Sequence, residues 1–254
     1  MRASYRNIGE TATDSHRLLR LDYASLCRPI AELPGQFVAC CSYSENEVAL
    51  TIGGSDSSDG RYSSLVSCFH RYLRMQLKNG AGRLISIAQE VNEMVYECCP
   101  NGCLLGCFFA IYSVPTRQLS YVNAGYGAPL LVRGQSSEVV PLEKGGPVFG
   151  LLRAPHYIER CTKLHPGDRF VAFTNTVIES FCTTNRGGAD KLLIDLIRQH
   201  QRCSAMDLAN AILSEAEDFS GSFLIDRMVM TACADDTTFA VRPRHFQRAH
   251  AAVA

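Results

Sequence analysis

Cysteine has the widest chemical repertoire of the residues in this sequence, because thiolates bind metals and form disulfides. The chain has 254 residues and 12 cysteines. Four of them stand close together around a Pro-Asn-Gly turn: Cys98, Cys99, Cys103 and Cys107. A structural zinc site usually pairs two separated knuckles, often with histidine, and this group has neither a second knuckle nor a nearby histidine. We therefore expect reduced cysteines that pack in the core or in turns.

Other residues with chemical potential stand in patterns that are typical of turns. The glycine-rich runs at 53–54 and 125–127 lack the strand–helix–acidic pattern of a dinucleotide site. Asp56 and Asp59 lie in a Gly/Ser loop, and the pair at 235–236 precedes a predicted strand. Taken alone, such aspartates are typical of turns and helix N-caps. No Ser/His/Asp arrangement for nucleophilic catalysis is supported, so any specific chemistry depends on longer motifs.

Five segments, in order, carry such motifs. They read YVNAGYGAPLL at 121–131, GPVFGL at 146–151, LHPGD at 164–168, FTNTVIES at 173–180 and DDTTFAV at 235–241. Together they resemble the PPM-type serine/threonine phosphatases of the SpoIIE and RsbU class. The forms in that class are YVNAGHNPPLL, GxPLGL, LxPGD, YTDGVxEA and DDxT. Order and spacing agree from about residue 22 to residue 243.

The resemblance implies a sandwich of two antiparallel sheets flanked by helix pairs, with two Mg²⁺ or Mn²⁺ ions at one end. In such enzymes a metal-bound water attacks a phosphoserine or phosphothreonine. Hard divalent ions need carboxylate oxygens to hold them and to offset their charge beside a dianionic phosphate. The family supplies these oxygens from aspartates in four segments of the chain.

Three of the four aspartate positions carry neutral residues in this sequence. In chain order these positions fall on Gln36, on Ser55 with Gly54 before it, and on Asn175. The fourth is retained as Asp235, with Asp236 beside it. The number of charged ligands tunes the affinity of hard-oxygen sites, so we expect a large loss of metal affinity. We assign no catalytic residue.

Three interpretations of function stay open. In the one we expect, the chain is a pseudophosphatase that needs no metal. It would bind a phosphoprotein, a STAS-domain anti-sigma antagonist or a similar regulatory protein in bacterial partner-switching signalling. In the second, the chain is an atypical active phosphatase. Asp56 or Asp59 would then join Asp235 and Asp236 around a single Mg²⁺ or Mn²⁺. In the third, it is a structural or oligomerisation module without a phosphoprotein partner.

Hydrophobic periodicity indicates the elements that carry these motifs. Apolar runs bounded by turn residues predict strands over 21–27, 35–41 and 47–52. Apolar residues at helical spacing predict helices over 62–77 and 84–96. Short strands with tight turns between them, typical of antiparallel hairpins, follow at 104–112, 119–123, 129–133, 138–142, 157–164 and 169–174.

Two further helices and one strand complete the predicted pattern. The helices are expected over 189–200 and 204–219, the second beginning with a capping box formed by Ser204 and Asp207. The last strand is expected over 237–242. Because the helix pairs are segregated between runs of antiparallel strands, we predict an α+β fold, a four-layer αββα sandwich.

The composition is that of one ordinary globular domain. The 25 Lys+Arg balance 25 Asp+Glu, whereas nucleic-acid-binding domains usually carry a basic excess. No apolar run approaches the roughly 18 residues that cross a bilayer, and the N-terminus lacks a secretory signal, so we expect a cytoplasmic protein without a membrane partner. We divide the chain into a polar leader (1–20), a phosphatase-like domain (21–243) and a tail (244–254). The leader is too short for a sensor domain, so we expect regulation from another chain; the oligomeric state is not indicated.

Overall fold

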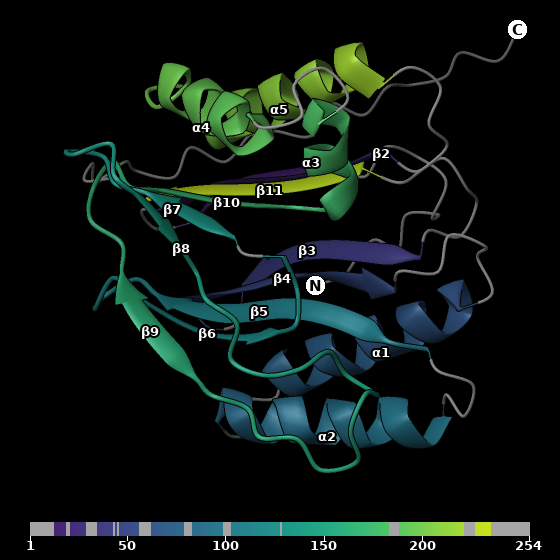
Figure 1. The fold of residues 1–254 in the computed structure, drawn as a ribbon. Coiled ribbons are helices and arrows are strands. Elements are labelled where there is room, and N and C mark those ends of the chain that lie inside the picture. Colours follow the sequence, from purple (N-terminus) through teal and green to yellow (C-terminus); the bar gives the residue numbers. More distant parts are fainter. Residues whose placement is uncertain are drawn as a thin grey trace, which may run out of the picture.

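In a computed structural model of the chain, two antiparallel sheets lie face to face, and helices cover both outer faces (Figure 1). The structure describes residues 13–18, 21–28, 35–42, 44, 46–55, 62–78, 83–98, 103–127, 129–182, 188–220 and 227–234. This arrangement confirms the predicted α+β sandwich. None of the helices in these ranges is long and apolar enough to cross a membrane.

One sheet has six strands in the order β1-β2-β11-β10-β7-β8, and the other has five in the order β3-β4-β5-β6-β9. The strands span Thr13–Leu18 (β1), Leu21–Arg28 (β2), Gln36–Ser42 (β3), Glu47–Ser55 (β4), Leu105–Ser113 (β5), Gln118–Ala124 (β6), Leu130–Val132 (β7), Val139–Pro141 (β8), Arg160–Lys163 (β9), Arg169–Phe173 (β10) and Arg227–Ala234 (β11). Every pair of neighbouring strands is antiparallel.

Helices pack on the outer faces through their apolar sides (Figure 1). They span Ser63–Lys78 (α1), Leu84–Cys98 (α2), Asn175–Cys182 (α3), Ala189–Gln199 (α4) and Ala205–Ser220 (α5). The first two cover the five-stranded sheet, and the other three cover the six-stranded sheet. In α2 the buried apolar positions are Leu84, Ile87, Ala88, Val91 and Val95, which is the spacing of one helix face.

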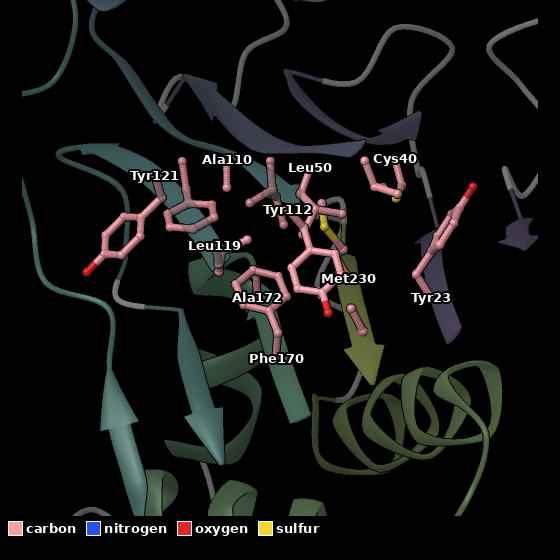
Figure 2. Close-up of a cluster of buried hydrophobic side chains, with 14 of the residues drawn as sticks. Tyr23, Cys40, Leu50, Ala110, Tyr112, Leu119, Tyr121, Phe170, Ala172 and Met230 are labelled. Carbon is pink, nitrogen blue, oxygen red and sulfur yellow. The ribbon is translucent and has the colours of Figure 1, made fainter. Parts of the chain in front are cut away.

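Three apolar clusters fill the spaces between the four layers. The cluster between the sheets includes Leu50, Tyr112 and Phe170 (Figure 2). Successive side chains of a strand point to opposite faces, so the residues next to these pack outward. Phe109 of β5 contributes to the cluster under α1 and α2, and Val171 of β10 to the cluster under the other helices.

Three elements differ from the sequence prediction. Residues 13–18, assigned to the polar leader, form the edge strand β1 and pair with β2. Helix α3 at 175–182 is only two turns long, too short for a helical period to be recognised. Strand β11 at 227–234 is buried on both faces and so shows no alternation. The predicted strand at 237–242 and the tail at 244–254 lie outside the described residues.

The cysteine group is split between the surface and the core. Cys98, at the end of α2, is exposed, whereas Cys103 and Cys107 are buried. Burial raises the pKa of the Cys107 thiol, so this residue stays protonated and packs as an apolar side chain. Cys99 lies outside the described residues.

Candidate functional site

The first two predicted ligand positions meet at the ends of two paired strands. Gln36 begins β3, and Gly54 is the second-last residue of β4. The two lie directly opposite each other in the antiparallel ladder. Leu50, which has the same parity as Gly54 along β4, points into the cluster between the sheets. Gln36 and Gly54 therefore lie on the face of the sheet that is turned toward the other sheet.

Ser55 belongs to the other face of β4. It follows Gly54 by one residue and has the parity of Ala49, which packs in the cluster under α1 and α2. Its side chain is buried, and its backbone N–H donates to Gly35 O at 2.9 Å. The ligand position that faces the second sheet is therefore Gly54. Ser55, to which counting along the sequence assigns the aspartate position, lies one residue further along the strand and on its opposite face.

The backbone leaves no room for a side chain at position 54. A Cβ atom on Gly54 would lie 2.6 Å from Gln36 Cγ and 2.8 Å from Gly35 O. Both distances are below 3.0 Å, which real Cβ atoms essentially never show. Since one of the two atoms belongs to the backbone, β3 would have to move before a carboxylate could be placed there.

The third position, Asn175, lies at the end of the six-stranded sheet, where β10 leads into α3. Asn175 is exposed and begins the helix. Thr174, just before it, is buried; its Oγ1 accepts from Met228 N at 3.2 Å and lies 2.7 Å from Thr176 Oγ1. A Cβ atom on Gly127 would lie 3.1 Å from Asn175 Oδ1. Asn175 is thus held next to the segment that follows β6.

Residues 125–127, which follow β6, lie between the end of one sheet that carries Gly54 and the end of the other that leads to Asn175. Gly106 of β5 pairs with Gly54, and a Cβ atom on Gly106 would lie 3.7 Å from Tyr126 Cα. Tyr126 in turn donates its hydroxyl proton to Phe173 O in the other sheet, at 3.0 Å, and its backbone N–H donates to Asn123 Oδ1 at 2.9 Å. The start of β3, the end of β4 and the start of α3, which carry Gln36, Gly54 and Asn175, therefore lie at one end of the sandwich (Figure 1).

The described residues at the predicted ligand positions, Gln36, Gly54 and Asn175, carry no charge. Gln36 Oε1 is buried without a hydrogen-bond partner. Burial, with a smaller effect of Cys107, raises the pKa of Tyr126, so its hydroxyl stays protonated. No group of three or more His, Cys, Asp or Glu among the described residues could hold a metal ion. Because two hard dications need several charged oxygens, the described residues do not fit them.

The acidic candidates of the sequence are not among these residues. Asp56, Asp59, Asp235 and Asp236 all lie outside the described ranges. Asp56 and Asp59 follow β4 directly, at the end of the strand where Gly54 lies. They remain predicted candidates next to this end of the sandwich.

Ala234, the last residue that the structure describes before Asp235, lies at the other end of β11. At the start of this strand Met228 O accepts from Thr174 N at 3.1 Å, next to Asn175. At its last residue Ala234 O accepts from Gly167 N at 2.9 Å. An eight-residue strand spans about 23 Å, so Ala234, the last described residue before Asp235, lies the length of the strand away from the end next to Asn175. That Asp235 joins Asn175 in one metal site stays a prediction.

The sequence has another aspartate just before the start of β11, which is the end of the strand next to Asn175. Asp226 directly precedes Arg227, the first residue of the strand, and lies outside the described residues. The signal that could have identified it is the apolar run at 228–230, which begins the central strand. Reading this run as the last strand would have placed the fourth aspartate position on Asp226.

A protein-family model matches most of the chain. The family model described as stage II sporulation protein E (SpoIIE) matches residues 60–241. Among curated proteins, none matches the chain.

Solved phosphatase structures share the fold. The structure of the RsbU and RsbW domains of a Mycobacterium tuberculosis protein has a TM-score of 0.72 and 17% identity, over 85% of this chain and 60% of that chain. The PP2C phosphatase domain of SpoIIE from Bacillus subtilis, solved with a fragment of its regulatory domain, has a TM-score of 0.74 and 12% identity, over 85% of this chain and 63% of that chain. The chain thus spans less than two thirds of both.

A further structure with this fold contains metal. The catalytic domain of the serine/threonine protein phosphatase PstP, in complex with two manganese ions, has a TM-score of 0.60 and 14% identity, over 85% of this chain and 99% of that chain. The manganese ions are a property of that phosphatase. An identity of 14% to this chain shows a shared fold only.

Proposed function

Since this chain belongs to the SpoIIE family of PPM-type phosphatases, we propose that it is a pseudophosphatase that keeps the fold and binds a regulatory protein. The observation that supports this proposal most strongly is the absence of a carboxylate at the three described ligand positions. Gln36 and Asn175 carry amides in place of carboxylates, and Gly54 has no side chain. Without carboxylates nothing described offsets the charge of two dications beside a phosphate dianion.

The close approach of β3 and β4 supports the proposed loss of metal binding. A single substitution cannot restore a carboxylate at position 54, because Gly35 O and Gln36 Cγ occupy the space that its Cβ would need. A merely weakened site would keep room for the missing ligands. This geometry favours a binding role over a slow enzyme.

The partner we propose is a phosphoprotein, a STAS-domain anti-sigma antagonist or a similar regulatory protein of a bacterial partner-switching circuit. One structural neighbour combines an RsbU and an RsbW domain in a single structure, which associates this fold with regulatory domains. Asn175 is exposed at this end, and its amide can donate and accept hydrogen bonds to a polypeptide.

A metal titration tests the proposal. We expect wild-type protein to give no saturable heat with Mn²⁺ in isothermal titration calorimetry and no hydrolysis of p-nitrophenyl phosphate above the blank. The double variant Gln36→Asp/Asn175→Asp adds two carboxylates at the site and should bind Mn²⁺ more tightly than wild type. Gln89→Asp, on the exposed side of α2, is the control for a carboxylate added elsewhere and should leave Mn²⁺ binding unchanged.

The active-enzyme alternative makes the opposite prediction. If Asp56 or Asp59 holds a single ion, wild-type protein with Mn²⁺ will hydrolyse p-nitrophenyl phosphate, and Asp56→Asn or Asp59→Asn will abolish the reaction. Comparing Asp226→Asn with Asp235→Asn then shows which of these two aspartates contributes a ligand to the metal ion. Metal-dependent hydrolysis by wild type that these variants remove would contradict the pseudophosphatase.

A further inference from the structure

The side chain of Tyr126 reaches from one sheet to the other at the end of the sandwich that carries the predicted ligand positions. Its hydroxyl donates to Phe173 O of β10 at 3.0 Å. On the other side, a Cβ atom on Gly106 of β5 would lie 3.7 Å from Tyr126 Cδ2, which is ordinary van der Waals contact. The ring therefore lies between β5 of the five-stranded sheet and β10 of the six-stranded sheet.

The five-stranded sheet presents two glycines at this end of its inner face. Gly54 and Gly106 lie opposite each other on β4 and β5. They have the parity of Leu50 and Phe108, which pack in the cluster between the sheets. Tyr126 packs against the same cluster. Its ring thus fills space that these two strands leave without side chains.

The turn before Tyr126 directs the ring into this space. Gly125 has a φ of +67°, and a Cβ atom there would overlap Val148 Cγ1 and lie 2.6 Å from Val148 N, so the turn requires glycine. The backbone N–H of Tyr126 donates to Asn123 Oδ1 at 2.9 Å, and Asn123 is itself fully buried. The backbone of Tyr126 is therefore fixed on both sides of the peptide bond that precedes it.

We propose that Tyr126 takes the place of a metal site: its ring fills the space between the ligand positions of the two sheets, and its hydroxyl joins the sheets there. An ion held jointly by positions 36 and 175 would need this space, because position 36 begins β3 and position 175 follows β10. The inference rests on the proposed function and deepens it. The chain has lost carboxylates at these positions, and Tyr126 fills the space between them.

Manganese titration of the carboxylate variant tests the role of the ring. In the background Gln36→Asp/Asn175→Asp, we expect Tyr126→Ala to tighten Mn²⁺ binding at least about tenfold in isothermal titration calorimetry, which is about 1.4 kcal/mol. Tyr121→Ala in the same background is the matched control. Tyr121 is also a tyrosine of the central cluster, but it lies on β6 and stacks on Phe108. This substitution should leave Mn²⁺ binding unchanged.

The variant Tyr126→Phe keeps the ring and tests the hydroxyl. The amide of Thr174, which follows Phe173 and donates to Met228 O, should exchange about fivefold faster in native-state hydrogen exchange, as the loss of about 1 kcal/mol from one hydrogen bond gives. Tyr157→Phe is the control, because it removes a buried hydroxyl that donates to Asn92 on α2. It should leave the Thr174 amide unchanged. Tyr126→Phe should also leave Mn²⁺ binding of the carboxylate background unchanged, because the ring remains.

The outcomes for Tyr126 and for the proposed function can be told apart. A triple variant with Tyr126→Ala that binds Mn²⁺ no more tightly than the double variant would overturn the role of the ring, and so would equal tightening by Tyr121→Ala. If thermal unfolding shows that Tyr126→Ala does not fold, Tyr126→Phe decides, and an unchanged Thr174 amide would overturn the proposal. Tight Mn²⁺ binding by wild-type protein would overturn the pseudophosphatase as well, whereas the comparison of triple and double variants concerns Tyr126 alone.

Discussion

His70 on α1 is a half-buried titratable residue, and one of its ring nitrogens is buried without a polar partner among the described residues. Its ring stacks on Phe37 with centroids 4.4 Å apart and planes inclined by 12°, and its Nε2 is buried without a hydrogen bond. Burial, with a smaller effect of the Arg74 charge, lowers the pKa of His70 from 6.5 to about 3. The ring is therefore neutral in the folded protein and packs as an apolar group behind the strand that begins with Gln36.

This pKa shift predicts a loss of stability in acid. The unfolded chain protonates His70 near pH 6.5, and the folded protein does so only near pH 3. Stability is therefore complete above pH 6.5 and falls as the pH drops from there toward 3. At about pH 5 the loss is about 2 kcal/mol, since each pKa unit corresponds to about 1.4 kcal/mol.

The variant His70→Phe keeps the ring stack and removes the titration. We expect urea denaturation to show a difference in unfolding free energy between about pH 7 and pH 5 that is about 2 kcal/mol smaller than in wild type. His165→Phe, at an exposed position, is the control and should keep the wild-type difference. An unchanged pH dependence in His70→Phe would show that other groups cause the acid loss.

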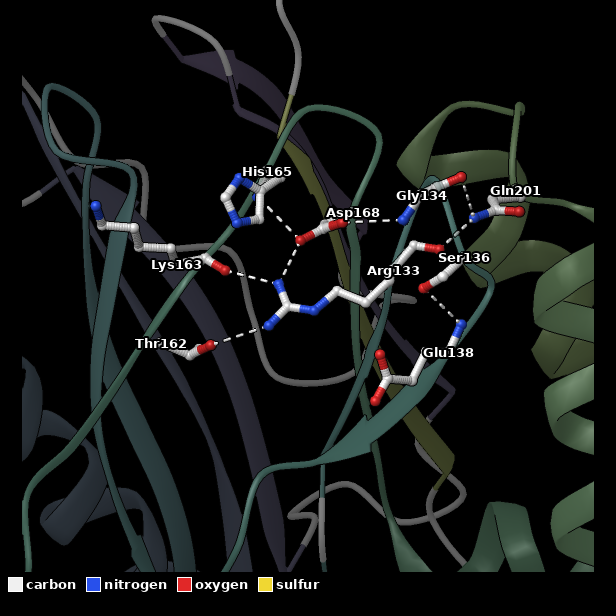
Figure 3. Close-up of polar contacts among 9 residues, drawn as sticks. All are labelled: Arg133, Gly134, Ser136, Glu138, Thr162, Lys163, His165, Asp168 and Gln201. Carbon is white, nitrogen blue, oxygen red and sulfur yellow. Dashed lines mark hydrogen bonds and ion pairs between the residues drawn. The ribbon is translucent and has the colours of Figure 1, made fainter.

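At the scale of elements, the turn that precedes β10 is built around one carboxylate. Asp168 accepts from Arg133 Nη1 at 2.6 Å, from Gly134 N at 2.9 Å and from His165 N at 2.9 Å (Figure 3). Arg133 Nη1 also donates to Lys163 O of β9, which belongs to the other sheet. The carboxylate thus joins the β7–β8 turn to both sheets, at the end of β10 away from α3. This accounts for the aspartate of the LHPGD motif in structural terms.

Removing this carboxylate should destabilise the fold strongly. Asp168→Ala leaves Arg133 and two backbone N–H groups without their acceptor, and breaking a buried pair in this way costs about 3 kcal/mol. Glu143→Ala is the matched comparison: Glu143 pairs with Arg160 at 3.2 Å, but its side chain is 68% exposed. We expect the second variant to have the wild-type midpoint in chemical denaturation. Equal effects of the two substitutions would contradict the structural role of the turn.

Helices and strands with a clear hydrophobic period and a capping or turn residue at their ends could be predicted from the sequence, and the others could not. Ser204 caps α5, because its Oγ accepts from Asp207 N at 3.1 Å, and the predicted pairing with Asp207 is a side-chain hydrogen bond from Ser204 Oγ to Asp207 Oδ2 at 2.7 Å. Short α3 and fully buried β11 give no period to recognise. Assigning the site positions requires the strand register, because a shift of one residue moves a side chain to the opposite face of the sheet. Counting along the sequence could therefore not decide between Gly54 and Ser55.

At the scale of the whole molecule, the central cluster is shared by the two sheets. Phe108 of β5 is fully buried and stacks on Tyr121 of β6, with ring centroids 5.4 Å apart, and on Phe170 of β10, at 5.6 Å. Among the described residues, the inner face of each sheet is covered by the inner face of the other sheet. Because each sheet buries its inner face only in the complete sandwich, the two should fold as one cooperative unit.

Phe108→Ala tests this cooperativity. Removing a fully buried phenylalanine should lower the unfolding free energy by about 4 kcal/mol, through lost apolar contact and the cavity left behind. In native-state hydrogen exchange, amides of β5 and β10 should lose protection by the same free energy, although the substitution lies in one sheet only. Met75→Ala, at an exposed position of α1, should leave both unchanged. If protection falls in β4, β5 and β6 while β10 and β11 keep theirs, the sheets open independently, and the shared cluster does not couple them.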